Sequence, residues 1–235
     1  SKSFGEFKLF RDVSFGLDKG QKVGLVAKNG AGKSTLFKIL MGKEIQDEGS
    51  VSYRDGLRVS CLDQEHDFGK AKTIEEFIYK SENPRIQLLD RYERHLKKGN
   101  TESDEFIQLM VKIDEQNAWE VDVKVNEILT SLKFPDKSQS LSNLSGGQAR
   151  RLSLDKVLID EPDVLYMDEP TNHLDFDMVE WLEKFISDSN LSLILITHDR
   201  YFLDNVCNEI IELSPTGVFN YKGDYEFYLN KNCLL

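Results

Sequence analysis

The sequence predicts an α/β fold built around a mostly parallel sheet. The first observation is a compact apolar strand, Lys22–Val26, followed by a glycine-rich loop and a helix at Thr35–Met41. The second is an alternation of helix and strand patterns from Gly147 to Val206, which is typical of parallel strands joined by crossover helices. With 235 residues, the chain is long enough to bury such a core without disulfides or metals.

Short β patterns surround the main strand in the first 70 residues. Candidates before it are Phe7–Phe10 and Val13–Leu17, and candidates after it are Gly49–Tyr53 and Leu57–Cys61. The Lys19-Gly20 pair reads as a turn between them. We therefore expect a small antiparallel β subdomain at the N-terminus.

The composition changes near Lys70. The segment Thr73–Leu132 is charged, nearly free of glycine and rich in apolar residues spaced by three and four. This spacing predicts two or three helices, broken near Asn83-Pro84 and Gly99-Asn100, whose apolar stripes pack into a core. We expect a single domain over residues 1–235, with a core made of residues 1–70 and 144–235 and a helical lobe over residues 71–143.

The last third of the chain completes the predicted sheet. The expected helices are Gln148–Ile159, Met178–Ser187 and Arg200–Val206, and the strands between them are Val164–Met167 and Leu191–Thr197. A small β meander is expected within Glu209–Tyr228, followed by the start of a helix.

Charge and cysteine usage limit the possible functions. Lys and Arg total 30 against 41 Asp and Glu, so the net charge is −11 and the pI is about 4.9. Such a surface repels phosphate backbones, which argues against nucleic-acid binding by the molecule as a whole. The three cysteines form no CxxC pair, so no zinc cluster or disulfide framework is predicted, and a reducing compartment is favoured.

A local basic strip and the apolar runs bear on partners and location. Residues 85–98 hold five cations, Arg85, Arg91, Arg94, Lys97 and Lys98, against Asp90 and Glu93. This strip is either a solvated helix face with charge pairs or an arm that contacts RNA. The strongest apolar run, Leu191–Ile196, is far short of the roughly 20 residues that cross a bilayer. We expect a cytoplasmic protein, or a piece of one, without direct membrane insertion.

The glycine-rich loop has the pattern of a phosphate cradle. Its glycines let consecutive N–H groups turn inward, and the helix behind it directs its positive dipole end at the same anion. Lys33 is placed to reach the β- and γ-phosphates, and the Ser34 hydroxyl to bind Mg²⁺. Alanine stands at position 27, where the full motif has glycine. The loop and its flanks comprise Ala27, Lys28, Asn29, Gly30, Ala31, Gly32, Lys33, Ser34 and Thr35.

Three further segments end at positions suited to the same chemistry. The apolar strand Val164–Met167, expected to be buried on both faces, delivers Asp168 to the sheet edge where ligands bind, so Asp168 is a candidate for holding Mg²⁺ and Glu169 for activating a water. His198 follows the next strand, within reach of a γ-phosphate. Taken singly, the acidic pair also fits a helix cap, and the histidine a structural role. Ser145, Gly146, Gly147 and Gln148 read as a tight turn and helix start, or as a second anion site.

The order of these motifs resembles the nucleotide-binding domain of ATP-binding cassette proteins, across essentially the whole chain. AKNGAGKST resembles Walker A, LSGGQ the signature, VLYMDE Walker B and Thr171–Asp175 the D-loop. The resemblance implies that Gln64 is the Q-loop residue, helping to hold Mg²⁺, and that Phe4 stacks on adenine. It also implies that His198 is the switch histidine and that ATP with Mg²⁺ is bound between two cassettes, the signature of one facing the Walker motifs of the other.

The motifs DEPTNHLD and THDRYFLD are similar to the ABC-F group, which lacks a membrane domain, and Asn117–Trp119 with the helix Val125–Leu132 resembles its Uup-like branch. This implies the N-terminal cassette of a two-cassette ATPase, weakly active alone and acting on ribosomes in translation. Two alternatives remain: a cassette of a membrane transporter, and a Uup-like ATPase that binds DNA structures.

Overall fold

The computed structural model describes residues 1–4, 7–28, 30–62, 67–214 and 217–232. It divides into two compact units, which we call the sheet unit, residues 1–64 and 162–235, and the helical unit, residues 65–161. The helical unit extends further than the expected lobe at 71–143 and includes the helix that follows LSGGQ. The reason is that this helix packs against two helices of the helical unit.

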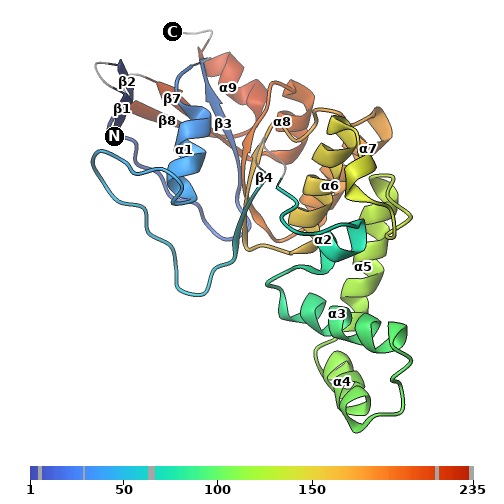
Figure 1. Cartoon of the computed structure of the whole chain (residues 1–235). Helices are drawn as coiled ribbons and strands as arrows, with labels where there is room; N and C mark the ends of the chain where they lie inside the picture. The colour runs from blue at the N-terminus through green and yellow to red at the C-terminus, as the bar shows by residue number, and fades with distance from the viewer. Residues whose placement is uncertain (5–6, 29, 63–66, 215–216, 233–235) are drawn as a thin grey trace. The chain divides into compact units, whose positions relative to one another are not determined.

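A six-stranded sheet forms the centre of the sheet unit (Figure 1). Its strands are β3 (Lys22–Ala27), β4 (Val59–Leu62), β5 (Val164–Asp168), β6 (Ser192–Ile196), β7 (Glu209–Ser214) and β8 (Gly217–Lys222), in the order β4-β5-β6-β3-β7-β8. Neighbouring strands are parallel except for β8, which is antiparallel to β7. Strands β1 (Lys2–Phe4) and β2 (Phe7–Phe10) form a separate antiparallel pair. The predicted α/β fold with a mixed core sheet and a small antiparallel β element is confirmed.

The described part of the sheet unit also contains the helices α1 (Lys33–Leu40), α7 (Phe176–Asp188), α8 (Arg200–Val206) and α9 (Tyr225–Asn232). Every residue of β5 and β6 is buried, which explains why both strands read as continuous apolar runs. One core cluster joins Val23 and Leu25 of β3 to Leu36 of α1 and Ile194 of β6. The sheet core therefore holds the start of α1 against the carboxyl ends of the central strands.

Two predicted strands are absent from the described residues. Val13, Phe15 and Leu17 pack against the core cluster from a segment that has no strand partner. In the segment 49–53, the Tyr53 hydroxyl contacts the Leu40 carbonyl oxygen at 2.6 Å and the Tyr166 hydroxyl at 2.9 Å. In both segments the alternating pattern reflects side-chain packing on the core, so the strand predictions for Val13–Leu17 and Gly49–Tyr53 were wrong.

The glycine at position 24 makes a close approach that the fold requires. A Cβ atom on Gly24 would lie 2.7 Å from Leu203 Cδ2 and 2.8 Å from Ile210 Cδ1. We expect Gly24→Ala to lower the free energy of unfolding by about 1–3 kcal/mol through overpacking. Gly16→Ala is the matched control, because no heavy atom lies within 4 Å of a Cβ there. Denaturant unfolding of the two variants checks this, and equal stabilities would contradict it.

The helical unit holds α2 (Ile74–Tyr79), α3 (Pro84–Lys97), α4 (Asp104–Glu115), α5 (Ala118–Ser131) and α6 (Gly146–Ile159). The expected break at Asn83-Pro84 is present, with Asn83 capping α3 and Pro84 in its first turn. The segment expected to hold two or three helices holds four, because Asn117 takes a left-handed conformation, φ 50°, and separates α4 from α5. Among the described residues, no helix has both the length and the apolar character needed to cross a membrane.

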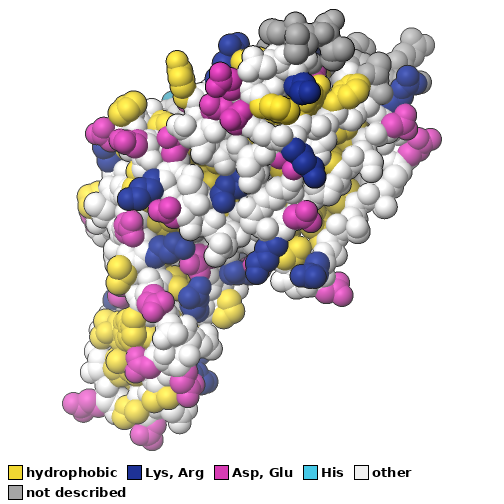
Figure 2. Space-filling view, turned by 180° about the vertical axis from the view of Figure 1, so that it is seen from behind, with side chains coloured by type: hydrophobic (Ala, Val, Ile, Leu, Met, Phe, Trp, Pro, Cys, Tyr) yellow, Lys and Arg dark blue, Asp and Glu magenta, His cyan; other side chains and the backbone are white. Residues whose placement is uncertain are grey.

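The basic strip on α3 is largely neutralised by carboxylates. Arg85 pairs with Glu161, Arg91 with Glu105 at 3.4 Å, Arg94 with Asp90 at 2.7 Å, and Lys97 with Glu75. On the face shown in Figure 2, basic and acidic side chains are interspersed over most of the surface. Of the two alternatives for residues 85–98, the structure therefore agrees with a solvated helix face that carries charge pairs.

A buried carboxyl on α6 predicts an unusual pH dependence. Asp155 is fully buried, and among the described residues neither of its carboxylate oxygens has a hydrogen-bond partner. Burial raises the pKa of Asp155 well above its ordinary value, although the positive charge of Arg151 opposes this. Because the folded chain holds this proton more tightly than the unfolded chain, the group favours folding at low pH, and that contribution is lost as the pH rises.

We therefore expect Asp155→Asn to be more stable than the unmodified chain at neutral pH. The gain should be about 1 kcal/mol or more, because a tenfold change in proton affinity corresponds to about 1.4 kcal/mol. It should shrink towards zero near about pH 3, where the unfolded chain is also protonated. Denaturant unfolding at both pH values measures it, with exposed Glu127→Gln as control. A pH-independent difference between the Asp155→Asn and unmodified chains would contradict the prediction.

Candidate functional site

The glycine-rich loop joins β3 to α1 in the way the sequence predicts. Gly32 is the N-cap of α1 at φ 92°, Gly30 lies at φ 79°, and no side chain caps the helix start. A Cβ on Gly32 would come within 3.0 Å of the Phe10 ring, so both backbone shape and space require glycine there. The N–H groups of the first turn are consequently available to an anion.

Lys33 is held by a weak partner. Its Nζ donates to the carbonyl oxygen of Ala27, the last residue of β3, at 3.0 Å. This contact folds the side chain back over the loop and uses a neutral acceptor instead of a carboxylate. An anion in the loop can therefore compete for the ammonium group, since charge-assisted hydrogen bonds are the stronger kind.

The structure brings Ser34 and Asp168 together although 134 residues separate them. The Ser34 Oγ donates to Asp168 Oδ2 at 3.0 Å. Asp168 ends β5, and Ser34 lies in the first turn of α1, which follows β3. Strand β6 pairs in parallel with both β3 and β5, so the carboxyl ends of these strands share one edge of the sheet. A hydroxyl and a carboxylate oxygen are hard ligands that suit Mg²⁺, which usually takes one or two protein oxygens together with phosphate oxygens and waters.

Glu169 is fixed from several directions. Its backbone is left-handed, φ 52°, and its N–H donates to the Ile196 carbonyl oxygen at 2.8 Å. Its carboxylate accepts from Thr197 Oγ1 at 3.1 Å and from the His198 N–H at 3.2 Å. The His198 ring Nε2 lies 3.6 Å from Glu169 Oε1, and its side chain is 72% exposed against 17% for Glu169. A strained backbone held this firmly is typical of an active-site residue.

Thr197 is a site residue that the sequence reading did not assign. Its hydroxyl donates to Glu169 and also accepts from the Asp199 N–H at 3.1 Å. It therefore links the carboxylate to the start of α8. The sequence did hold a signal for this role, because Thr197 is a hydroxyl residue directly after β6. Strand β6 pairs with β5, and Glu169 directly follows β5.

The LSGGQ segment lies in the helical unit and forms the start of α6. Ser145 and Gln148 make a reciprocal capping box: Gln148 N–H donates to Ser145 Oγ at 3.3 Å, and Ser145 N–H to Gln148 Oε1 at 2.9 Å. The N–H groups of Gly146 and Gly147 lie before the intrahelical ladder, where an anion can accept from them. Ser145 and Gly146 are exposed.

Some predicted site residues fall outside the described part. Asn29 of the loop and Gln64, the expected Q-loop residue, lie outside the described residues. Phe4 is the last residue of β1. The roles predicted for these three residues remain predictions.

Comparisons with known proteins agree on the family. The family model described as ABC transporter matches residues 10–172. The ATP-binding protein YfmR of Bacillus subtilis is 36% identical over 98% of this chain and 38% of its own length. The energy-dependent translational throttle protein EttA of Mycobacterium tuberculosis is 34% identical over 98% of this chain and 42% of its own length. The ATP-binding protein Uup of Escherichia coli is 34% identical over 97% of this chain and 36% of its own length. The chain thus spans about two fifths of these relatives.

A solved structure supports the fold. The ATP-binding subunit of an ABC transporter superposes with a TM-score of 0.70 at 19% identity, covering 98% of this chain and 90% of that one. Plant ABC transporter F family members are among the sequence relatives. The chain belongs to the ABC transporter family of ATP-binding cassettes, and its relatives are of the ABC-F type.

Proposed function

We propose that this chain binds MgATP and hydrolyses it together with a second cassette. The observation that supports this best is the cluster at one sheet edge: the Ser34 hydroxyl 3.0 Å from the Asp168 carboxylate, and Glu169 directly after it. The loop before α1 supplies N–H donors for phosphate oxygens beside this cluster. Family membership adds the same expectation from an independent source.

Each residue has a distinct role in this proposal. Lys33 would exchange the Ala27 carbonyl for the β- and γ-phosphates, and Ser34 and Asp168, with Gln64, would hold Mg²⁺. The bound Mg²⁺ supplies charge neutralisation on the phosphates. Glu169 orients the attacking water and accepts its proton, with Thr197 keeping the carboxylate in place. His198, whose ring Nε2 lies 3.6 Å from Glu169 Oε1, would contact the γ-phosphate.

The signature supports the need for a second cassette. One chain carries one phosphate loop and one LSGGQ, and the latter presents exposed Ser145 and Gly146 at the start of α6. In the proposal, these residues serve a nucleotide bound to the partner cassette, in the same chain or in a second copy. Turnover of the isolated chain should then rise with the square of its concentration, and Ser145→Arg should remove it. A rate strictly proportional to concentration, unchanged in Ser145→Arg, would overturn this.

The cellular role proposed is on ribosomes, in translation, in the cytoplasm. It is supported by the 34% identity to a protein named a translational throttle. The α3 strip adds little, since most of its cations are already paired with carboxylates within the helical unit. A transporter cassette and a Uup-like ATPase acting on DNA structures are the alternatives.

Sedimentation separates these roles. We expect the chain, with non-hydrolysable ATP analogue and Mg²⁺, to pellet with ribosomes at about 0.15 M salt, where long-range attraction between exposed charges is screened. Branched DNA and membrane vesicles offered under the same conditions are the competing partners. Preferential recovery with either of them would replace the ribosomal proposal.

A further inference from the structure

Two tyrosine hydroxyl groups form a bridge between α1 and β5, the elements that carry Ser34 and Asp168. Tyr53 lies in the segment between α1 and β4, and Tyr166 is the third residue of β5. Their hydroxyl oxygens are 2.9 Å apart, and the Tyr53 hydroxyl also donates to the Leu40 carbonyl oxygen at 2.6 Å. Neither hydroxyl has a role in the reaction proposed for the site.

The direction of the bridge follows from its protons. A carbonyl oxygen can only accept, so the single hydroxyl proton of Tyr53 is used in the bond to Leu40. The Tyr166 hydroxyl is therefore the donor in its contact with Tyr53. Leu40 is the last residue of α1, where a carbonyl group has no N–H partner within the helix. The bonds from Tyr166 through Tyr53 thus tie the carboxyl end of α1 to β5.

The faces of α1 and β5 that the bridge joins are those that meet at the proposed metal ligands. Ser34 and Phe37 are three residues apart on α1 and share one helix face. Tyr166 and Asp168 are two residues apart on β5 and share one face of the sheet. The Phe37 and Tyr166 rings have centroids 5.3 Å apart, and Ser34 Oγ lies 3.0 Å from Asp168 Oδ2. The bridge, the ring contact and the site therefore follow one another along the same pair of elements.

This arrangement makes the bridge a brace for the two oxygen ligands. Because close-packed interiors transmit strain, a shift at the carboxyl end of α1 reaches Ser34 at its start. Mg²⁺ demands near-ideal octahedral geometry at short distances, so a changed separation of Ser34 and Asp168 lowers its affinity. The N–H groups of the phosphate loop precede α1 and move with it, so binding of ATP without metal should depend less on the bridge.

We propose that Tyr53 and Tyr166 are positioning residues that set the separation of Ser34 and Asp168, and thereby the affinity for Mg²⁺ beside bound ATP. The inference rests on the proposed function, since it needs Ser34 and Asp168 to be the metal ligands. The two tyrosines act through α1 and β5 and do not contact the metal themselves. Phenylalanine at either position keeps the ring and removes only the hydroxyl, so such variants isolate the bridge.

The test is the affinity for a fluorescent ATP analogue, measured with Mg²⁺ and with EDTA. We expect Mg²⁺ to tighten binding by the unmodified chain. Tyr53→Phe should reduce this gain about three- to tenfold, the equivalent of about one hydrogen bond, and leave the affinity in EDTA unchanged. Tyr166→Phe should reduce it less, because Tyr53 keeps its bond to Leu40. The double variant should match Tyr53→Phe, since neither of them retains a bridge.

A second readout requires no ligand. In the ligand-free chain, Tyr53→Phe should speed amide hydrogen exchange at the carboxyl end of α1, where the Met41 N–H donates to the Phe37 carbonyl oxygen. Exchange in α7 should stay as in the unmodified chain, which separates a local effect from a general loss of stability.

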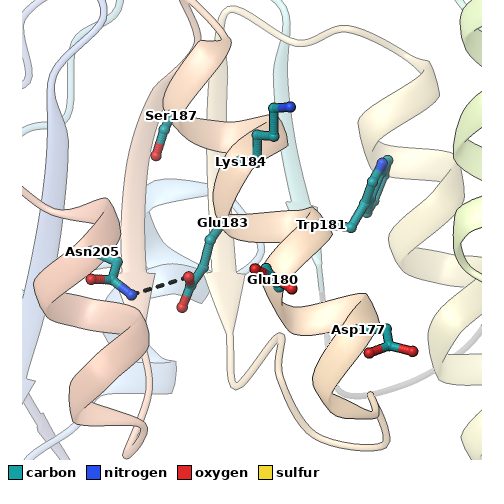
Figure 3. Close-up of a pocket in the computed structure, with 7 residues that line it drawn as sticks. All are labelled: Asp177, Glu180, Trp181, Glu183, Lys184, Ser187 and Asn205. Carbon is teal, nitrogen blue, oxygen red and sulfur yellow. Dashed lines mark hydrogen bonds between the residues drawn. The ribbon is translucent and has the colours of Figure 1, made fainter.

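Two variants of the sheet unit serve as controls. Tyr221→Phe removes another tyrosine hydroxyl, which donates to Glu212 Oε2 at 3.3 Å between β8 and β7. Asn205→Ala removes a side-chain hydrogen bond between two other elements, the 3.0 Å contact of Asn205 on α8 with Glu183 on α7 that Figure 3 shows. Both variants should keep the full Mg²⁺ gain and the exchange rates of α1.

The outcomes distinguish this inference from the proposed function. An equal Mg²⁺ gain in the unmodified chain and in both tyrosine variants would overturn the inference and leave the proposed function standing. No Mg²⁺ gain in the unmodified chain would overturn the proposed function and this inference with it. A reduced gain in the two controls as well would show a general effect of stability, and would likewise count against the bridge. Thermal melts establish that each variant is folded.

Discussion

Replacing Glu169 with Gln is expected to lower ATP hydrolysis by about 10²–10⁴-fold, the usual contribution of a positioned general base. The amide keeps the shape of the side chain and can still accept from Thr197 Oγ1 and the His198 N–H, so the site should stay assembled. Affinity for MgATP should therefore be retained. Single-turnover hydrolysis and equilibrium binding of a fluorescent ATP analogue measure the two properties separately, at chain concentrations that favour pairing of cassettes.

Two comparisons make this prediction specific. Thr197→Val should reduce hydrolysis less, because it removes one hydrogen bond to the carboxylate and leaves the base in place, and Thr197→Ser should restore activity. Glu127→Gln, on the exposed side of α5, should match the unmodified chain. A Glu169→Gln chain that turns over ATP at the normal rate would remove Glu169 from the role of base.

Replacing Lys33 with Ala is expected to weaken MgATP binding by about 10–100-fold, the equivalent of one or two lost charge-assisted hydrogen bonds. Lys33 stands at the first position of α1, beside N–H groups that no side chain caps, and its ammonium contacts the Ala27 carbonyl oxygen. Losing that contact should cost little stability, so the defect should appear in affinity and not in folding. Isothermal titration calorimetry with MgATP measures it.

Lys38→Ala is the matched control for this change. Lys38 is exposed in the last turn of the same helix, so its removal changes the net charge equally without touching the loop. It should bind MgATP like the unmodified chain. If both lysine variants lost affinity to the same extent, the effect would come from overall charge, and the loop would not be the phosphate site.

Much of the fold was predictable because its signals are local. Strand β5 reads as an apolar run since both of its faces are buried, and α3 begins where Asn83 and Pro84 provide a cap and a first turn. The strands expected at 13–17 and 49–53 failed for the opposite reason. Their apolar residues meet partners distant in sequence, such as Tyr166 for Tyr53, and no local pattern distinguishes such packing from a sheet ladder.

For the candidate site, the sequence by itself determined which residue types are present and in what order: a glycine-rich loop before a helix, carboxylates after one buried strand and a histidine after another. Only the tertiary structure decided which of them meet. Because β6 lies between β3 and β5, the sheet places Ser34 beside Asp168 and adds Thr197 to Glu169. It also decided that four cations of α3 are paired with carboxylates, since charge compensation depends on distances between side chains that linear order does not specify.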